Sequence, residues 1–354
     1  MPPIDPVGEI AAAPANASRG GPRPLPSTRP ADAAGVQLLW PGKFDEHGCR
    51  RSPGSVPIGS HEVLTRFGEG PSACRLIHAD FRTAVGTIEP HSIDFAYVDP
   101  PFGTDRDRFL ADTKGIVRAE HHQPRAAYCD RWSTPEYLDF LDDLIALTRP
   151  LLCETGSLAV HVDHRASAHV RCLLDEHFGA DRFINELIWK YGLGNATASR
   201  HFLRKHDTIL VYGLSPRHFF NRQRGPITQA QQRKYHHEDE RGRYMMSYGK
   251  RYDLKGGKPL ESVLDIPSLG ATDGERCGYP TQKPLRLLEV LLESFCPPGG
   301  IVLDPCGGSG TTAVAAQRSG RAWIAIDASQ AAIESATQRL AAETACAFAI
   351  ERVT

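Results

Sequence analysis

Residues 301–317 read IVLDPCGGSGTTAVAAQ and contain a short apolar run followed by a loop rich in glycine. The run from Ile301 to Leu303 predicts a strand that ends at Asp304, and a helix is predicted to begin near Thr311. Glycines in such a loop let the backbone turn tightly and approach a ligand at the helix N-terminus. The loop residues with this expected role are Pro305, Gly307, Gly308, Ser309, Gly310 and Thr311. The stretch therefore predicts the ligand-binding turn of an α/β fold.

The next predicted strand, 322–326, ends at Asp327 and is followed by a predicted helix over 330–342. A carboxylate at this place suits the ribose diol of an adenosine group. The segment 308–313 also matches the GxGxxA fingerprint of dinucleotide sites. Asp304 at the start of the loop would repel a pyrophosphate, whereas it would pair with the ammonium of a cationic cofactor. This favours S-adenosyl-L-methionine, with an NAD-linked oxidoreductase as the alternative from another class.

The rest of the chain shows alternating strand and helix patterns. Apolar runs predict strands at 74–78, 93–98, 157–162, 185–189 and 208–212, and helical periodicity predicts helices at 135–148, 166–177 and 284–295. This alternation implies a mainly parallel sheet covered by helices on both faces. With 354 residues, 41% of them hydrophobic, the chain is long enough to bury a large core.

Composition excludes several classes of protein. The chain has no apolar run of about 18 residues that would span a membrane, and no secretory signal pattern at its start. Nine cysteines without a CxxC pair indicate reduced thiols and a cytoplasmic location. The histidine and cysteine spacings, such as His161 with His164, do not match known zinc sites, so we expect no metal.

Charge is segregated along the chain although the total is only -1. Residues 190–260 contain 15 Lys and Arg against 5 Asp and Glu, which indicates affinity for an acidic polymer. Residues 1–35 are rich in Pro and Ala and lack apolar periodicity, so we expect a disordered tail. Order is expected to begin near Val36, with a short strand or a packed arm reaching Trp40.

A second candidate site follows the strand at 93–98 and reads Asp99-Pro100-Pro101-Phe102. The two prolines stiffen the backbone and leave their carbonyl groups free. The Asp99 carboxylate and the Pro100 carbonyl then form a rigid double acceptor beside an aromatic ring. Such a pair suits an exocyclic aromatic amine with two N–H donors. The simpler alternative is a turn that ends the strand and buries Phe102.

These motifs resemble the amino-methyltransferases that act on DNA bases. The family's catalytic motif is similar to DPPF at 99–102, its TQKP segment to residues 281–284, and its cofactor motif to DPCGGSGTT at 304–312. The order of the three motifs matches the permuted β class, and the similarity covers about residues 74–345. The resemblance implies a Rossmann-like, S-adenosylmethionine-dependent methyltransferase fold with circularly permuted motif order. It also implies a catalytic half at 36–191, a basic target-recognition region at 192–276 and a cofactor-binding half at 277–354.

The resemblance also implies roles for single residues. Asp99 and Pro100 would accept hydrogen bonds from the target amine, with Pro101 stiffening the turn, and Phe102 would stack on the flipped base. The cofactor-binding residues would be Asp80 near the adenine amine, Thr281, Gln282 and Lys283 near the methionine carboxylate, Asp304 at the ammonium, and Asp327 at the ribose. Where the family often has an aromatic residue, five positions after Asp327, this chain has Ala332, so adenine packing must come from elsewhere.

The sequence therefore predicts a site-specific enzyme that methylates N6 of adenine in duplex DNA after base flipping. A cytosine-N4 methyltransferase fits the same double acceptor, and a DNA-binding module without activity is a third hypothesis. The sequence leaves open whether the chain forms a homodimer or acts with a restriction partner.

Overall fold

The computed structural model describes residues 37–53, 59–68, 73–104, 106–110, 125–192, 200–270, 272–343 and 347–354. The expected N-terminal tail, 1–35, lies outside these residues. In the described parts of the chain, no helix is both long and apolar enough to cross a membrane.

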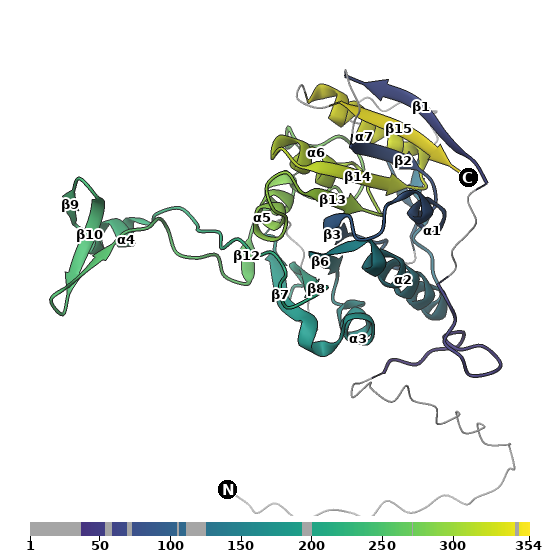
Figure 1. Cartoon of the computed structure of the whole chain (residues 1–354), viewed down its shortest axis with the longest axis horizontal. Helices are drawn as coiled ribbons and strands as arrows, with labels where there is room; N and C mark the ends of the chain where they lie inside the picture. Colours follow the sequence, from purple (N-terminus) through teal and green to yellow (C-terminus); the bar gives the residue numbers. More distant parts are fainter. Residues whose placement is uncertain are drawn as a thin grey trace, which may run out of the picture.

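The core of the molecule is one large mixed sheet (Figure 1). In spatial order its strands are β1 (His61–Phe67), β15 (Phe348–Val353), β2 (Cys74–His78), β14 (Ala322–Asp327), β13 (Ile301–Asp304), β3 (Ile93–Val98), β6 (Leu152–Val162), β8 (His206–Gly213), β7 (Phe183–Lys190) and β12 (Val263–Asp265). The strands from β15 to β6 run parallel to one another, whereas β1 and β8 are antiparallel to their neighbours. The sheet thus confirms the predicted Rossmann-like architecture.

Helices cover both faces of the sheet. One face carries α1 (Phe81–Ala84), α2 (Thr134–Thr148) and α3 (Ser167–Phe178), with short 3-10 turns at Val85–Thr87, Arg149–Leu151 and Ala180–Arg182. The other face carries α5 (Leu285–Phe295), α6 (Thr311–Arg318) and α7 (Gln330–Ala342). Side chains of β3 alternate between the two cores, with Phe95 in one and Ala96 in the other. Burial on both faces explains why central strands such as β3 and β13 are largely apolar in sequence.

The two motif halves of the sequence meet in the middle of the sheet. Strand β13 pairs with β3, with Val302 opposite Phe95 and Leu303 opposite Ala96. The chain leaves β13 toward β14 on one side, and leaves β3 toward β6 on the other. This is the switch point at which ligands bind in open α/β sheets, beyond the carboxyl ends of the strands.

Most of the predicted elements are present within a few residues of the expected bounds, but several elements were not predicted. In and beside the large sheet these are strands β1, β15 and β12, the short helix α1, and the pair β4 (Arg108–Phe109) and β5 (Ala126–Tyr128). The elements within residues 229–253 were not predicted either. The segment 37–40 is a packed arm rather than a strand, because Trp40 is buried and its Nε1 donates to Asp139 over 2.7 Å. Short elements like these carry too few residues for a periodic pattern.

Residues 214–262 connect β8 to β12 and form an arm, the outer part of which extends away from the sheet (Figure 1). Its outer part contains α4 (Gln229–Lys234), β9 (His237–Asp239), β10 (Gly242–Ser247) and β11 (Lys250–Asp253), and none of the residues in these elements is buried. Its two connecting segments are hydrogen-bonded to each other, from the Gly225 N–H to the Lys258 carbonyl over 2.9 Å. Strands β8 and β12 lie within 192–276 yet belong to the large sheet.

Candidate functional site

A row of aspartates follows the parallel strands at the switch point. Asp80 comes after β2, Asp327 ends β14, Asp304 ends β13 and Asp99 comes directly after β3, and these strands are neighbours in that order. Because the strands are parallel, all four carboxylates lie at the same edge of the sheet.

A cavity of about 470 Å³ lies at this edge, which is a usual size for a small-molecule site. All of the site residues expected from the sequence line it, with the exception of Gly310. Its walls therefore include Asp80, Asp99, Pro100, Pro101, Phe102, Thr281, Gln282, Lys283, Asp304, Pro305, Gly307, Gly308, Ser309, Thr311 and Asp327. The fold brings together residues that lie more than two hundred positions apart in the chain.

The cavity is electrostatically negative at its base. The pKa of Asp304 is raised to about 7, mainly by burial, and the nearby charges of Asp99 and Asp327 contribute in the same direction. Burial also raises the pKa of Asp327. Raised carboxyl pKa values indicate charges that lack nearby compensation, so a cationic ligand would be stabilised here.

The Gly-rich loop is held against β14 by backbone groups. The N–H of Gly308 donates to Oδ2 of Asp327 over 2.8 Å, and the N–H of Gly307 donates to the Ile326 carbonyl over 2.8 Å. Gly310, which precedes α6, has a φ of 75°, and a Cβ there would lie 2.8 Å from Cβ of Ala336. Gly310 is therefore needed for the close packing of the loop on α7, which explains its absence from the cavity wall.

Asp99 and Phe102 share one neighbour. Oδ2 of Asp99 contacts the Lys283 ammonium, whose nitrogen also lies 5.0 Å from the centre of the Phe102 ring. Oδ1 of Asp99 is buried and has no hydrogen-bond partner among the residues that the structure describes. A buried carboxylate oxygen without a partner is costly, and Asp99 lines the cavity, so a ligand that supplies a hydrogen-bond donor would be stabilised there.

The segment Thr281-Gln282-Lys283 forms a strained turn at the cavity. Thr281 has a φ of 61°, which is unusual for a residue other than glycine. The Gln282 side chain accepts from the Cys277 N–H over 2.9 Å and donates to the Glu275 carbonyl over 2.8 Å. Both groups of its amide thus stabilise the turn that presents Lys283.

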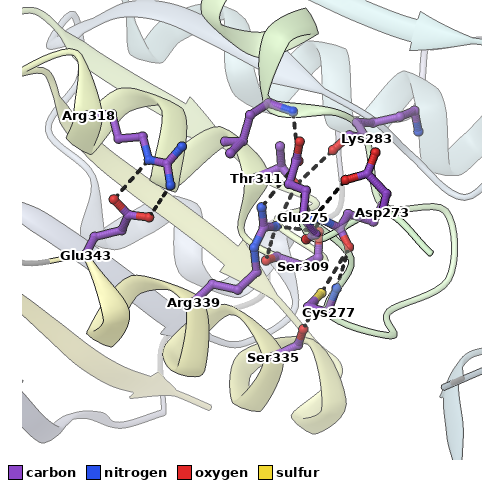
Figure 2. A network of polar contacts seen from close by, with 12 residues as sticks. Asp273, Glu275, Cys277, Lys283, Ser309, Thr311, Arg318, Ser335, Arg339 and Glu343 are labelled. Carbon is purple, nitrogen blue, oxygen red and sulfur yellow. Dashed lines mark hydrogen bonds and ion pairs between the residues drawn. The ribbon is translucent and has the colours of Figure 1, made fainter. Parts of the chain in front are cut away.

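Sequence reasoning missed Arg339, which lies on α7 and supports the loop (Figure 2). Its guanidinium donates to the Ser309 carbonyl over 2.9 Å and to the Thr311 hydroxyl over 2.8 Å. Burial lowers the pKa of Arg339, and Glu275 is its nearest carboxylate at 3.7 Å. Helical spacing could have indicated that Arg339 faces the loop, since it follows Ala332 and Ala336 on one face of the helix.

The loop after Phe102 is fixed by another residue that sequence reasoning missed. Asp130 is fully buried, and its carboxylate accepts from the backbone N–H groups of Gly103 and Thr104 over 2.8 and 3.1 Å. On the other side, the Phe102 ring lies 6.0 Å from the buried His161 ring, which is hydrogen-bonded to the Tyr97 hydroxyl over 2.7 Å. The DPPF turn is therefore held from both sides.

Two tyrosines supply aromatic surface near the Gly-rich loop. Tyr128 on β5 and Tyr279 stack with ring centres 6.4 Å apart, and both line the cavity. The Tyr279 ring packs against Ala332, and burial raises the pKa of Tyr128 to about 12. Both rings thus belong to the same apolar cluster as Ala332.

The arrangement fits S-adenosylmethionine better than a dinucleotide. Four carboxylates suit a ligand with a positive charge and a sugar diol, and they would repel a pyrophosphate. Among the described residues, no group of three or more side chains could hold a metal ion.

Comparisons with known proteins identify the family of the chain. A family model described as DNA methylase matches residues 93–338. The chain is 26% identical over 370 residues to the Type II methyltransferase M.EcaI of Enterobacter cloacae, which covers 88% of this chain and 79% of that protein. It is 24% identical over 278 residues to the DNA adenine methyltransferase YhdJ of Escherichia coli (strain K12), which covers 78% of this chain and 85% of that protein.

One solved structure shows the shared fold. The PvuII DNA methyltransferase (cytosine-N4-specific) superposes with a TM-score of 0.51 at 14% identity, and the match covers 76% of this chain and 86% of that one.

Proposed function

Because this chain belongs to the DNA methylase family, whose model spans residues 93–338, we propose that it methylates N6 of adenine in duplex DNA at a defined sequence. S-adenosyl-L-methionine is the methyl donor. The observation that carries the proposal is the buried, unpartnered Oδ1 of Asp99, a residue that lines the same cavity as Phe102 and the Gly-rich loop.

The cavity residues divide into two groups by chemistry. Asp304 would bind the ammonium of the cofactor, Asp327 its ribose hydroxyls, and Lys283 its carboxylate. Tyr128 and Tyr279 would pack on its adenine, in place of the aromatic residue absent at Ala332. When bound, S-adenosylmethionine supplies an electrophilic methyl group.

Asp99 and the DPPF turn act on the target base. The Asp99 carboxylate and the Pro100 carbonyl would accept the two N–H groups of the exocyclic amine, so that its lone pair leaves conjugation with the ring. The Asp99 carboxylate would also accept a proton from the amine as it is methylated. Phe102 would stack on the flipped base. Positioning is the main contribution of these residues, and no cysteine nucleophile is needed.

We propose that the arm at 214–262 is the DNA-contacting part of the predicted recognition region, 192–276. The arm contains 11 Lys and Arg against 5 Asp and Glu, and its outer elements bury none of their residues. A basic, thin structure of this kind suits phosphate contacts along a groove. Its affinity for DNA should fall steeply with salt, because bound cationic side chains displace counterions.

Adenine is proposed rather than cytosine on two grounds. The adenine methyltransferase YhdJ aligns with most of the chain, and Phe102 offers a wide stacking face without a hydroxyl that needs a partner. If the modification protects DNA from an endonuclease, that enzyme would be the partner of a restriction–modification pair.

The test is the chemical identity of the product. Unmodified genomic DNA is treated with the purified protein and S-adenosylmethionine, digested to nucleosides and examined by mass spectrometry, with the Asp99→Ala variant as control. We expect N6-methyladenine from the wild type alone. N4-methylcytosine as the main product would replace the adenine assignment, and 5-methylcytosine would contradict the mechanism, since carbon methylation needs a nucleophile.

A further inference from the structure

Lys283 occupies the place that the target amine needs. Its ammonium contacts Oδ2 of Asp99 and lies 5.0 Å from the centre of the Phe102 ring. The same cation therefore covers both the carboxylate that would bind the target amine and the ring on which the base would stack. The Lys283 side chain is only 8% exposed and that of Asp99 only 18%. An extrahelical base could not bind Asp99 and Phe102 while the ammonium remains there.

The other basic side chains at the cavity are engaged elsewhere. Arg82 pairs with Asp143 over 3.0 Å, and Arg108 donates to the Thr104 hydroxyl over 3.1 Å. Lys283 is therefore the cation that compensates the buried charge of Asp99 among the described residues lining the cavity. Without it, neither oxygen of this carboxylate would have a partner among the described residues, and an uncompensated buried charge is costly.

The Lys283 backbone is fixed, so only its side chain needs to move. Its carbonyl accepts from the Thr311 hydroxyl over 3.3 Å, and the next residue, Pro284, directly precedes α5. The side chain can therefore change partner without rearrangement of the loop.

We propose that Lys283 is a positioning residue that sets the order of binding, so that the target base binds only after the cofactor carboxylate has drawn the ammonium away from Asp99. The proposal rests on the proposed function. Each step exchanges one partner for another. The carboxylate of the cofactor binds the Lys283 ammonium, and Asp99 becomes free to bind the amine of the base. Neither the Lys283 ammonium nor the Asp99 carboxylate then stays unpaired.

This order has a thermodynamic consequence. If the cofactor carboxylate favours base binding, the flipped base must increase the affinity for the cofactor by the same factor. We expect a coupling of about tenfold, within the usual range for linked sites. A purely structural role of Lys283 would not produce this reciprocity.

The experiment uses a duplex with the sequence that the enzyme methylates, as found by sequencing the modified DNA, and with 2-aminopurine next to the target adenine. Its fluorescence rises when the neighbouring adenine leaves the stack. S-adenosylhomocysteine carries the carboxylate, whereas 5′-methylthioadenosine lacks the amino-acid end and serves as the matched ligand control. We expect the wild-type protein to increase the 2-aminopurine fluorescence with S-adenosylhomocysteine and not with methylthioadenosine. Equal fluorescence with either ligand or with none would overturn the proposal.

Two variants test the residue itself. Lys283→Met should flip the base without any ligand and lose the coupling, while Lys283→Arg keeps the charge and should retain the dependence on S-adenosylhomocysteine. A Lys283→Met protein that still requires the ligand would contradict the role. A failure of the proposed function is distinguishable, because the wild type would then transfer no methyl group to DNA at all.

Discussion

The guanidinium of Arg339 donates a hydrogen bond over 2.9 Å to the carbonyl oxygen of Ser309, so helix α7 directly supports the Gly-rich loop. The same group donates to the Thr311 hydroxyl in the first turn of α6 (Figure 2). The loop conformation thus depends on a largely buried charge that lies outside the loop.

Replacing Arg339 by Met should weaken cofactor binding about tenfold, because the Ser309 carbonyl and Thr311 hydroxyl lose a charged donor. DNA binding should stay unchanged. The measurement is calorimetric titration with S-adenosylhomocysteine. Arg318→Met is the matched control, since Arg318 on α6 pairs with Glu343 and its side chain is 48% exposed. Equal losses in both variants would show that Arg339 has no special role.

Substitution of Asp99 should affect catalysis, whereas substitution of Asp327 should affect cofactor binding. Asp99→Ala removes the acceptor for the target amine, so we expect methyl transfer to fall more than about a hundredfold, as losses of this kind do, with cofactor affinity nearly intact. Asp327→Ala removes the acceptor of the Gly308 N–H and should weaken cofactor binding first. Transfer of labelled methyl groups and equilibrium dialysis measure the two effects. Turnover by Asp99→Ala near the wild-type rate would refute its role.

Cofactor affinity should depend on pH through Asp304. Its pKa of about 7 means that the group is largely neutral at pH 6 in the free protein. A cationic ligand binds the carboxylate form, so its affinity should rise as the pH increases from 6 and level off above 7, with proton release on binding below pH 7. Titration calorimetry in buffers with different ionisation enthalpies measures both. Asp304→Asn should bind weakly and without this pH dependence.

The raised pKa of Asp304 also predicts how the free energy of unfolding changes with pH. An unfolded Asp titrates near 3.8, so between that value and about 7 the folded protein holds a proton that the unfolded chain has lost. The contribution of Asp304 to the free energy of unfolding therefore falls as pH rises through this window and is constant above it. Urea unfolding of the free protein and of Asp304→Asn at pH 5 and pH 8 tests the sign, and a wild type without this difference from the variant would contradict it.

Gly310→Ala should destabilise the fold and the loop together. Its φ of 75° strains any side chain, and the new Cβ would lie 2.8 Å from Cβ of Ala336, so we expect a loss of about 1–3 kcal/mol. Gly320→Ala is the matched control, because Gly320 has a φ of 68° but nothing within 4 Å of the added Cβ. Urea unfolding compares the two variants, and equal losses would mean that backbone strain alone explains the effect.

The sequence by itself determined the motifs, most of the strands and helices that carry them, and the edge of the sheet at which they meet. Asp99, Asp304 and Asp327 each follow an apolar run, and parallel strands place their carboxyl ends together. Strand and helix patterns are local, so a single chain segment is sufficient to reveal them. The low periodicity and basic charge of 190–260 likewise indicated a segment of a different kind, although β8 and β12 within 192–276 belong to the sheet.

Only the tertiary structure decided which side chains share the cavity and what they contact there. The Lys283–Asp99 contact joins residues 184 positions apart, the Arg339–Ser309 bond joins α7 to the Gly-rich loop, and Asp130 anchors the loop after Phe102. Tyr279 packs against Ala332, where sequence reasoning saw only a missing aromatic residue. Side-chain partners, burial and the resulting pKa of Asp304 depend on the packing of several elements at once, and no local pattern in the chain encodes them.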